Sequence, residues 1–212
     1  PIGAGLGGGS SDAAGFLAGV ARLYGETLSP KDLPALAARL GSDVPFFLRG
    51  GLAHATGRGE QVRHLCPMPP FAVVLASPAN TISTTWAYRQ VRNGLTPPGD
   101  AARVHIASAI TRRDLQGAAN AMQNAFEGIV LTQLPGIAEL KRALVSSGAI
   151  GALLSGSGST VFGLAPSLRA AQAVVHGPVA EALDGDVGQR RRVRRQRRWI
   201  VAARHRFWSK SR

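Results

Sequence analysis

The sequence is poor in several residue types, and each scarcity narrows what the protein can be. Cys66 is the single cysteine among 212 residues, which excludes an internal disulfide framework and suits a reducing compartment, so we expect a cytoplasmic protein. No apolar run approaches the roughly eighteen residues of a membrane-spanning helix, and we therefore expect no membrane partner. The five histidines show no metal-ligand spacing, which argues against a zinc site.

Acidic residues are also scarce, and their distribution separates a body from a tail. The chain has 12 Asp and Glu against 25 Lys and Arg, for a formal net charge of +13. Residues 189–212 contain ten arginines, one lysine and no acid, whereas residues 1–188 are close to balanced. The high isoelectric point is therefore a property of the tail.

Three interpretations of the C-terminal tail, residues 184–212, which contains this basic stretch, stay open. Its arginines, together with Trp199, Phe207 and Trp208, could bind nucleic acid or anionic lipid through charge and stacking. Alternatively, the tail is a solvated, disordered extension, or the out-of-frame translation of a GC-rich gene. We expect a disordered or frameshifted tail, and nucleic-acid binding only if the tail is genuine.

Glycine, by contrast, is abundant at the start of the chain, in PIGAGLGGGSSDAA (residues 1–14). Glycines leave backbone N–H groups uncovered and allow positive φ, so a polyanion can approach the main chain closely. The segment runs into a helix whose first-turn N–H groups and dipole favour negative charge. The hydroxyls of Ser10 and Ser11 can bind phosphate or a metal ion on it. These features predict a nucleoside triphosphate site.

Other interpretations of this segment are weaker. Gly3, Gly5 and Gly8 form a G-x-G-x-x-G pattern, but this pattern alone is a weak signal of a dinucleotide-binding fold. No Gly-Lys-Ser/Thr follows, which excludes a Walker A loop. A flexible linker does not explain why a helix with regular apolar spacing comes next.

The remaining patterns predict an α+β protein with a boundary near the prolines of residues 66–70. The first of two helices before this boundary presents an apolar stripe to a core, formed by Ala13, Phe16, Leu17, Val20 and Tyr24. The second starts with Ser29 as its cap and Pro30 at its first position, and it ends at Gly41. Later segments read as alternating strands and helices: strands at 71–76, 151–154 and 160–164, and helices at 84–92, around 106–130 and at 137–145.

Three segments together resemble the GHMP kinases, a superfamily of small-molecule kinases. Residues 1–14 resemble their nucleotide-binding motif. GSDVPFFLRGGLAHATGRGEQV (residues 41–62) resembles the region of their catalytic aspartate, and GALLSGSGSTVFGL (residues 151–164) is similar to their third, glycine-rich motif. The resemblance runs to about residue 180.

This resemblance implies a two-domain fold. An ATP-binding N-terminal domain would occupy residues 1–68, and a ferredoxin-like C-terminal domain residues 71–183. In the family, a segment ahead of the phosphate motif carries a lysine that acts with the aspartate, in a Pro-Ala-Lys-x-Asn-like motif. Nothing in this sequence resembles that segment, so we expect an incomplete N-terminal domain, poor folding of this polypeptide alone and impaired kinase activity.

The resemblance also implies roles for individual residues. Asp43 matches the aspartate held to deprotonate the substrate hydroxyl, although a helix cap is the alternative. ATP would be bound by the first motif: Pro1, Gly3, Gly5, Leu6, Gly7, Gly8, Gly9, Ser10 and Ser11. Ser10 and Ser11 would also contact Mg²⁺. The third motif would support this nucleotide loop, unless it is a plain tight turn: Ser155, Gly156, Ser157, Gly158 and Ser159.

Two further segments refine the expected function. Tyr88, in SPANTISTTWAYRQV (residues 77–91), matches a ring that stacks on a cytosine of the substrate, with a place in the core as the alternative. Asn124 lies in an Asn-x-Phe-Glu segment for which a structural role is expected. The sequences of residues 77–91 and of Asp43–Phe47 (Asp-Val-Pro-Phe-Phe) favour one branch of the superfamily. Its members phosphorylate a hydroxyl of 4-diphosphocytidyl-2-C-methyl-D-erythritol in non-mevalonate isoprenoid biosynthesis.

Two alternatives to this function stay open. The chain could be another GHMP kinase with a different alcohol substrate, or an inactive kinase fragment whose arginine-rich tail binds polyanions. ATP and Mg²⁺ are the expected cofactors of the kinase, and its expected partners are the small-molecule substrate and ATP. The sequence gives no prediction of the oligomeric state.

Overall fold

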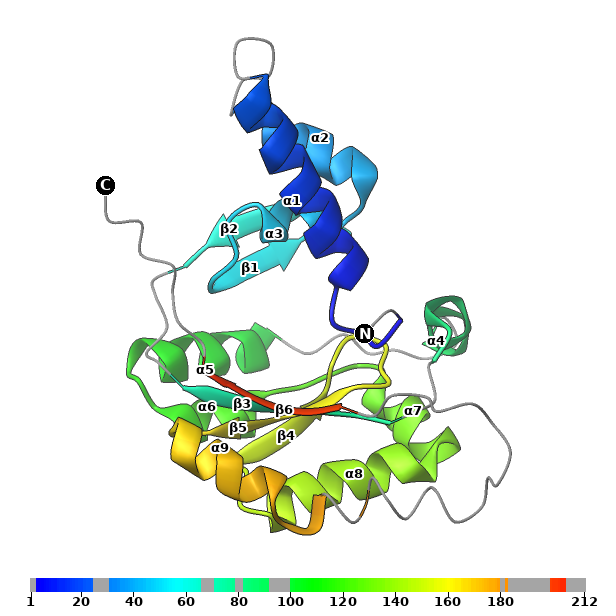
Figure 1. The fold of residues 1–212 in the computed structure, drawn as a ribbon, viewed down its shortest axis with the longest axis vertical. Helices are drawn as coiled ribbons and strands as arrows, with labels where there is room; N and C mark the ends of the chain where they lie inside the picture. Colours follow the sequence, from blue (N-terminus) through cyan, green and yellow to red (C-terminus); the bar gives the residue numbers. More distant parts are fainter. Residues whose placement is uncertain are drawn as a thin grey trace. The chain divides into compact units, whose positions relative to one another are not determined.

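The computed structural model describes residues 3–24, 31–65, 71–78, 82–91, 100–179, 182 and 199–204. The chain splits into two compact units (Figure 1). The first consists of Pro1–Ile2 and Gly7–Met68, and the second of Gly3–Leu6 and Pro69–Arg212. The glycine-rich segment at the start of the chain therefore contributes to both units.

The first unit combines three helices with a hairpin. α1 (Gly8–Leu23) packs against α2 (Leu33–Leu40) and α3 (Val44–Phe47). β1 (Ala53–Thr56) pairs antiparallel with β2 (Gln61–His64). The core of this unit is small and consists of Ala14, Ala37 and Val44, with Ala13, Leu17, Phe47 and Leu48 packed against them.

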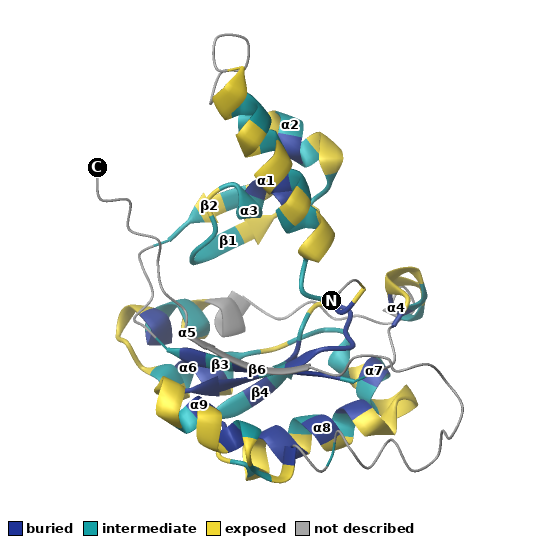
Figure 2. Cartoon of the chain, viewed as in Figure 1, coloured by how far each residue is buried: buried dark blue, intermediate teal, exposed yellow. Residues whose placement is uncertain are grey.

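The apolar stripe of α1 is narrower than its spacing predicts. Ala13 and Leu17 pack against the core, but Phe16 is 75% exposed and Tyr24 is 64% exposed. Phe16 lies at the border of the stripe, and Tyr24 is the C-cap residue beyond the last helical turn. Figure 2 shows how much of α1 is exposed. The prediction of the helix is confirmed, whereas the burial of these two rings was wrongly predicted.

The start of α2 also differs from the prediction. Asp32 occupies the N-cap position without a side-chain hydrogen bond to the helix, and a proline follows in the first turn. The predicted cap, Ser29, and Pro30 lie outside the described residues. The helix ends at Leu40 and Gly41 follows, as its pattern predicts.

The second unit is built on an antiparallel sheet in the order β4-β5-β3-β6. β3 (Ala72–Ser77) pairs with β5 (Val161–Ala165) and with β6 (Trp199–Arg204), and β4 (Gly151–Leu154) pairs with β5. Along the chain these strands and the intervening helices follow the order strand, helix, strand, strand, helix, strand. This order and the spatial order together give the ferredoxin-like topology, which confirms the predicted fold class.

β6 comes from the basic tail, for which the sequence predicts disorder or a frameshift. The structure describes Trp199–Arg204 as a strand along β3, which differs from the expectation of disorder for these six residues. Ile200 and Val201 are β-branched and favour a strand, a signal hidden among the arginines. Residues 183–198 and 205–212 lie outside the described residues, so polyanion binding by the tail stays a prediction.

Helices follow β3 and β5. α4 (Thr84–Val91), α5 (Asp100–Thr111), α6 (Leu115–Ala121), α7 (Glu127–Gln133) and α8 (Pro135–Ser146) lie between β3 and β4 in the chain, and α9 (Leu168–Val175) follows β5. α8 contacts β4 and β5, and α9 contacts β3, β5 and β6 (Figure 1). In the described part of the chain, none of the helices has the length and apolarity needed to span a bilayer.

The core of the second unit follows from two sequence periods. Alternate residues of β3, namely Ala72, Val74 and Ala76, are fully buried, as expected for one face of a strand. On α8, Leu140 and Leu144 lie one turn apart and are also buried. The predicted strand at residues 71–76 and the predicted helix at 137–145 are therefore confirmed, each shifted by no more than two residues.

Candidate functional site

The glycine-rich segment alternates in backbone conformation. φ is +70° at Gly3, +76° at Gly5 and +67° at Gly7, whereas Ala4 and Leu6 between them are not in the positive-φ region. In such an alternation, successive backbone N–H groups line a concave surface that binds anions. Pro1, which was predicted to take part in the same site, lies outside the described residues.

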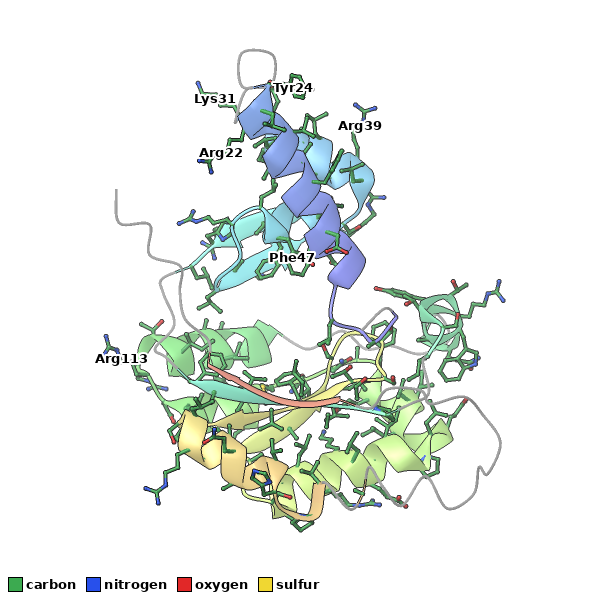
Figure 3. The ribbon with its side chains drawn as sticks, viewed as in Figure 1. Arg22, Tyr24, Lys31, Arg39, Phe47 and Arg113 are labelled. Carbon is green, nitrogen blue, oxygen red and sulfur yellow. The ribbon has the colours of Figure 1, made fainter. Side chains whose placement is uncertain are left out.

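Close packing requires two of these glycines as well. A Cβ at Gly5 would meet the backbone oxygen of Ser155 and lie 2.9 Å from that of Gly158, within the second unit. A Cβ at Gly7 would lie 2.7 Å from the ring of Phe47, a residue that Figure 3 labels in the first unit. Gly5 is therefore packed closely within the second unit, and Gly7 within the first.

α1 starts without a side-chain cap. Gly7 is its N-cap residue, and the first helical hydrogen bond runs from the Ser11 N–H to the Gly7 oxygen at 2.9 Å. The N–H groups before Ser11 in the first turn therefore have no acceptor within the helix. No heavy atom lies within 4 Å of the position a Cβ would take on Gly9. This open, uncapped helix start fits a phosphate group.

The hydroxyls of Ser10 and Ser11 lie in the same helical turn. Ser11 Oγ donates a hydrogen bond to the Gly8 oxygen at 2.8 Å, which leaves its lone pairs for a cation or a second donor. Both serines are half-buried. The donor set therefore fits a polyphosphate with a bound divalent cation, because hydroxyl oxygens are suitable ligands for Mg²⁺.

The third glycine-rich loop, Ser155–Ser159, packs directly against the glycine-rich segment. Ser155 Oγ donates to the Gly5 oxygen at 2.8 Å, and the Thr160 N–H donates to the Ala4 oxygen at 3.2 Å. The Gly158 N–H donates to the Ser155 oxygen at 2.9 Å and closes a tight turn. The two interpretations that the sequence left open, a tight turn and a support for the first segment, are thus compatible.

Hydroxyl groups gather around this loop, and Ser77, Ser157, Ser159 and Thr160 are buried whereas Thr84 is exposed. Thr160 Oγ1 donates to Ser77 Oγ at 3.1 Å, and Ser157 Oγ lies 3.5 Å from Thr84 Oγ1. Ser159 is 1% exposed, and its Oγ has no hydrogen-bond partner among the described residues. Sequence reasoning missed Ser77, Thr84 and Thr160, because single hydroxyl residues far apart in the chain form no local pattern.

Asp43 lies exposed at the N-cap position of α3, in the first unit. Its carboxylate accepts no hydrogen bond from that helix, so the alternative reading as a helix cap finds no support in the geometry. Val44 and Pro45, which follow it, are buried. A Cβ on Gly59 would lie 3.5 Å from Asp43 Oδ1. The backbone of Asp43 is therefore anchored, while its carboxylate faces solvent beside the turn between β1 and β2.

Tyr88 lies on α4 in the second unit and is 56% exposed, whereas its neighbour Ala87 is buried. Its ring makes an edge-to-face contact with Phe126, with centroids 5.0 Å apart and an interplanar angle of 75°. Such a contact fixes the ring and leaves aromatic surface in solvent. The alternative place in the core is therefore wrong for Tyr88, although Trp86 on the same helix does pack against the core.

The sequence-predicted residues are thus distributed over the two units. Gly3–Leu6, Tyr88 and the third loop belong to the second unit, and Asp43, Ser10 and Ser11 belong to the first. Hydrogen bonds join the third loop to Gly5 and Ala4. In the first unit, α1 and α3 are in contact, so Ser10 and Asp43 lie on neighbouring helices.

Comparison with known families gives two matches to this chain. The family described as GHMP kinases N terminal domain matches residues 1–51, and the family described as GHMP kinases C terminal matches residues 106–181. The first match lies in the first unit apart from Gly3–Leu6, and the second match lies in the second unit.

Individual relatives point in the same direction. The chain is 44% identical over 174 residues to the 4-diphosphocytidyl-2-C-methyl-D-erythritol kinase of Pelotomaculum thermopropionicum, covering 82% of this chain and 60% of that protein. A crystal structure of 4-(cytidine 5'-diphospho)-2C-methyl-D-erythritol kinase is 36% identical with a TM-score of 0.69, covering 95% of this chain and 67% of that one. The chain spans about three fifths of the length of the curated relatives it matches.

A second solved structure shows how widely the fold is shared. Homoserine kinase from Cytophaga hutchinsonii superposes with a TM-score of 0.70 at 22% identity, covering 97% of this chain and 66% of that one. At this identity the likeness concerns the fold alone. Fold similarity therefore does not identify the acceptor alcohol.

Proposed function

This chain belongs to the GHMP kinase family, and on that premise we propose that the full-length protein is an ATP-dependent kinase. Its acceptor is a hydroxyl of 4-diphosphocytidyl-2-C-methyl-D-erythritol. The identity of 44% to a kinase of that name supports the choice of acceptor. The observation that carries the reaction type is the glycine-rich segment, in which the sign of φ alternates and which leads into the uncapped start of α1. Hydrogen bonds hold this segment to the third glycine-rich loop.

The glycine-rich segment binds the polyphosphate of ATP. Backbone N–H groups of residues 3–9 and the first turn of α1 donate to phosphate oxygens, and the helix dipole favours the negative charge. The hydroxyls of Ser10 and Ser11 hold phosphate oxygens or the Mg²⁺ that accompanies them. When bound, ATP supplies the phosphoryl group and Mg²⁺ neutralises charge on it.

Asp43 accepts the proton of the substrate hydroxyl. In the reaction the acceptor oxygen bonds to the γ-phosphorus, the bond between that phosphorus and the bridging oxygen breaks, and ADP leaves. The proton lost by the hydroxyl passes to a carboxylate that makes no cap hydrogen bond with its helix. A base in this position typically contributes about 10²–10⁴-fold to the rate.

Tyr88 provides a stacking surface for the cytosine of the acceptor. More than half of the residue is exposed, and the edge contact with Phe126 holds the ring in place. Stacking of a base on one aromatic side chain is worth about 1–3 kcal/mol, enough to favour a cytidine-containing alcohol over one without a base.

A comparison of acceptors tests this proposal. The full-length protein is incubated with ATP and Mg²⁺ and, separately, 4-diphosphocytidyl-2-C-methyl-D-erythritol, homoserine or mevalonate, and the release of ADP is measured. We expect acceptor-dependent ADP only with the cytidine compound. Preference for homoserine or mevalonate would assign the chain to a different branch, and the absence of acceptor-dependent ADP with all three would overturn the proposal.

A further inference from the structure

Asn124, between α6 and α7, binds three backbone groups at once. Its Nδ2 donates to the oxygens of Leu154 and Gly156, each at 2.8 Å, and its Oδ1 accepts from the Phe126 N–H at 2.8 Å. The two carbonyls fix the orientation of the amide, because a flipped side chain would face them with its oxygen. Both donor hydrogens of this side chain are therefore directed at the end of β4.

Glu127, three residues later, holds the same point of the chain. Its Oε1 accepts from the Leu154 N–H at 2.9 Å, and Lys141 Nζ of α8 lies 2.8 and 2.7 Å from its two carboxylate oxygens. The side chains of Lys141 and Glu127 are only 27% and 16% exposed. This partial burial means that solvent and salt screen the ion pair less than they would a surface pair.

Leu154 is the last residue of β4, which lies at one edge of the described sheet. The polar groups of an edge strand need partners other than a further strand. Asn124 and Glu127 supply them, one for the Leu154 oxygen and one for its N–H. These two residues and Lys141 form what we term the β4 anchor.

The chain passes from the β4 anchor directly into the loop that holds the glycine-rich segment. Ser155 Oγ binds the Gly5 oxygen, and the Thr160 N–H binds the Ala4 oxygen. A Cβ on Gly156 would lie 3.2 Å from the Gly5 oxygen. One short loop is therefore fixed by the anchor at its start and carries the phosphate-binding backbone on its other side, all within the second unit.

We infer that Asn124, Glu127 and Lys141 are positioning residues for nucleotide binding, acting through the third glycine-rich loop. The inference rests on the proposed function, because it assigns phosphate binding to Gly3–Leu6. The anchor itself acts without touching the nucleotide. It fixes the position and direction of residues 155–160. Ser155 and Thr160 in turn hold the carbonyl oxygens of Gly5 and Ala4, and thereby the direction of the adjoining N–H groups.

The first test replaces Asn124 in the full-length protein and compares it with a matched control. Asn124→Ala removes the three hydrogen bonds. Asn120→Ala removes an exposed asparagine of α6 whose Oδ1 accepts a hydrogen bond from Gln116 Nε2. Amide hydrogen exchange is measured without ligand, and the dissociation constant of ATP with Mg²⁺ is measured by calorimetry.

For Asn124→Ala we expect exchange at Gly158 and Thr160, and the ATP dissociation constant, to rise at least about five-fold, because the loss of even one hydrogen bond changes an equilibrium by about that factor. Asn120→Ala should leave both unchanged. A merely structural role would instead raise exchange throughout the sheet and leave ATP affinity of the folded protein as it was, and that result would overturn the inference.

A milder variant keeps the inference testable if Asn124→Ala fails to fold. Glu127→Gln retains an acceptor for the Leu154 N–H but removes the charge that pairs with Lys141, so we expect a rise of about two- to five-fold in loop exchange and ATP dissociation. Its control is Glu139→Gln, at an exposed position of α8. Equal values for the two variants would refute the anchor. Failure of the wild-type protein to bind ATP would instead refute the proposed function, so the two failures are distinguishable.

Discussion

Replacing Gly9 with alanine tests whether a bound ligand requires a glycine at this position, because the packing of the protein does not. Gly9, Gly15 and Gly19 all lie in α1, and no heavy atom lies within 4 Å of a Cβ built on any of them. Alanine in a helix is more stable than glycine by about 0.5–1 kcal/mol, and somewhat less at the first turn. Each substitution should therefore raise or preserve the stability of the protein.

Only Gly9 adjoins the uncapped N–H groups that we assign to phosphate. A methyl group there takes the space that a phosphate oxygen needs, so we expect Gly9→Ala to raise the dissociation constant of ATP at least ten-fold, or about 1.4 kcal/mol. Gly19→Ala is the matched control and should bind ATP as the wild type does. Thermal unfolding measures stability and calorimetry measures affinity.

Two results would refute this reasoning. Gly9→Ala could bind ATP with unchanged affinity, which would remove the first turn of α1 from the site. Gly19→Ala could weaken binding as much as Gly9→Ala, which would mean that the loss reflects the helix as a whole and not the space beside Gly9.

Further substitutions test the other assignments. Asp43→Asn should lower kcat by about 10²–10⁴-fold with unchanged stability. Asp32→Asn, also at an N-cap without a side-chain hydrogen bond, should leave kcat unchanged. Equal rates for the two variants would contradict the role of Asp43 as the general base. Gly5→Ala places a Cβ 2.9 Å from the Gly158 oxygen at φ +76° and should lower the unfolding free energy by about 1–3 kcal/mol, so an unchanged denaturation midpoint would contradict the packing. Tyr88→Ala should raise the KM for the cytidine acceptor by about 5–150-fold and leave the KM for ATP unchanged, with Tyr88→Phe near wild type. Equal rises in both KM values would argue against stacking.

Local patterns account for the parts of the fold that the sequence predicts well. The glycines of residues 3–9 and the helix after them form one continuous signal, and the structure describes that helix over Gly8–Leu23. The apolar run at 71–76 becomes β3 because alternate residues face the core. The order of the predicted strands and helices gives the α+β class, whereas the ferredoxin-like topology is implied by the family resemblance and is completed by β6, which the sequence patterns do not predict.

Contacts between distant residues account for the rest. The hydrogen bond from Ser155 to Gly5 joins positions 150 apart in the chain. The sequence around one of these residues does not indicate that the other is its partner. The β4 anchor likewise depends on partners 27 and 30 residues away. The exposure of Phe16 depends on which elements cover α1, which helical spacing alone does not specify.

Phosphoryl transfer to the acceptor is the central claim, and mass spectrometry of the acceptor tests it most directly. The full-length protein is incubated with ATP, Mg²⁺ and 4-diphosphocytidyl-2-C-methyl-D-erythritol, in parallel with its Asp43→Asn variant. We predict that the wild type adds one phosphoryl group per acceptor molecule, with one ADP formed for each, and that the variant does so far more slowly. An acceptor of unchanged mass after ATP has been consumed would contradict the account.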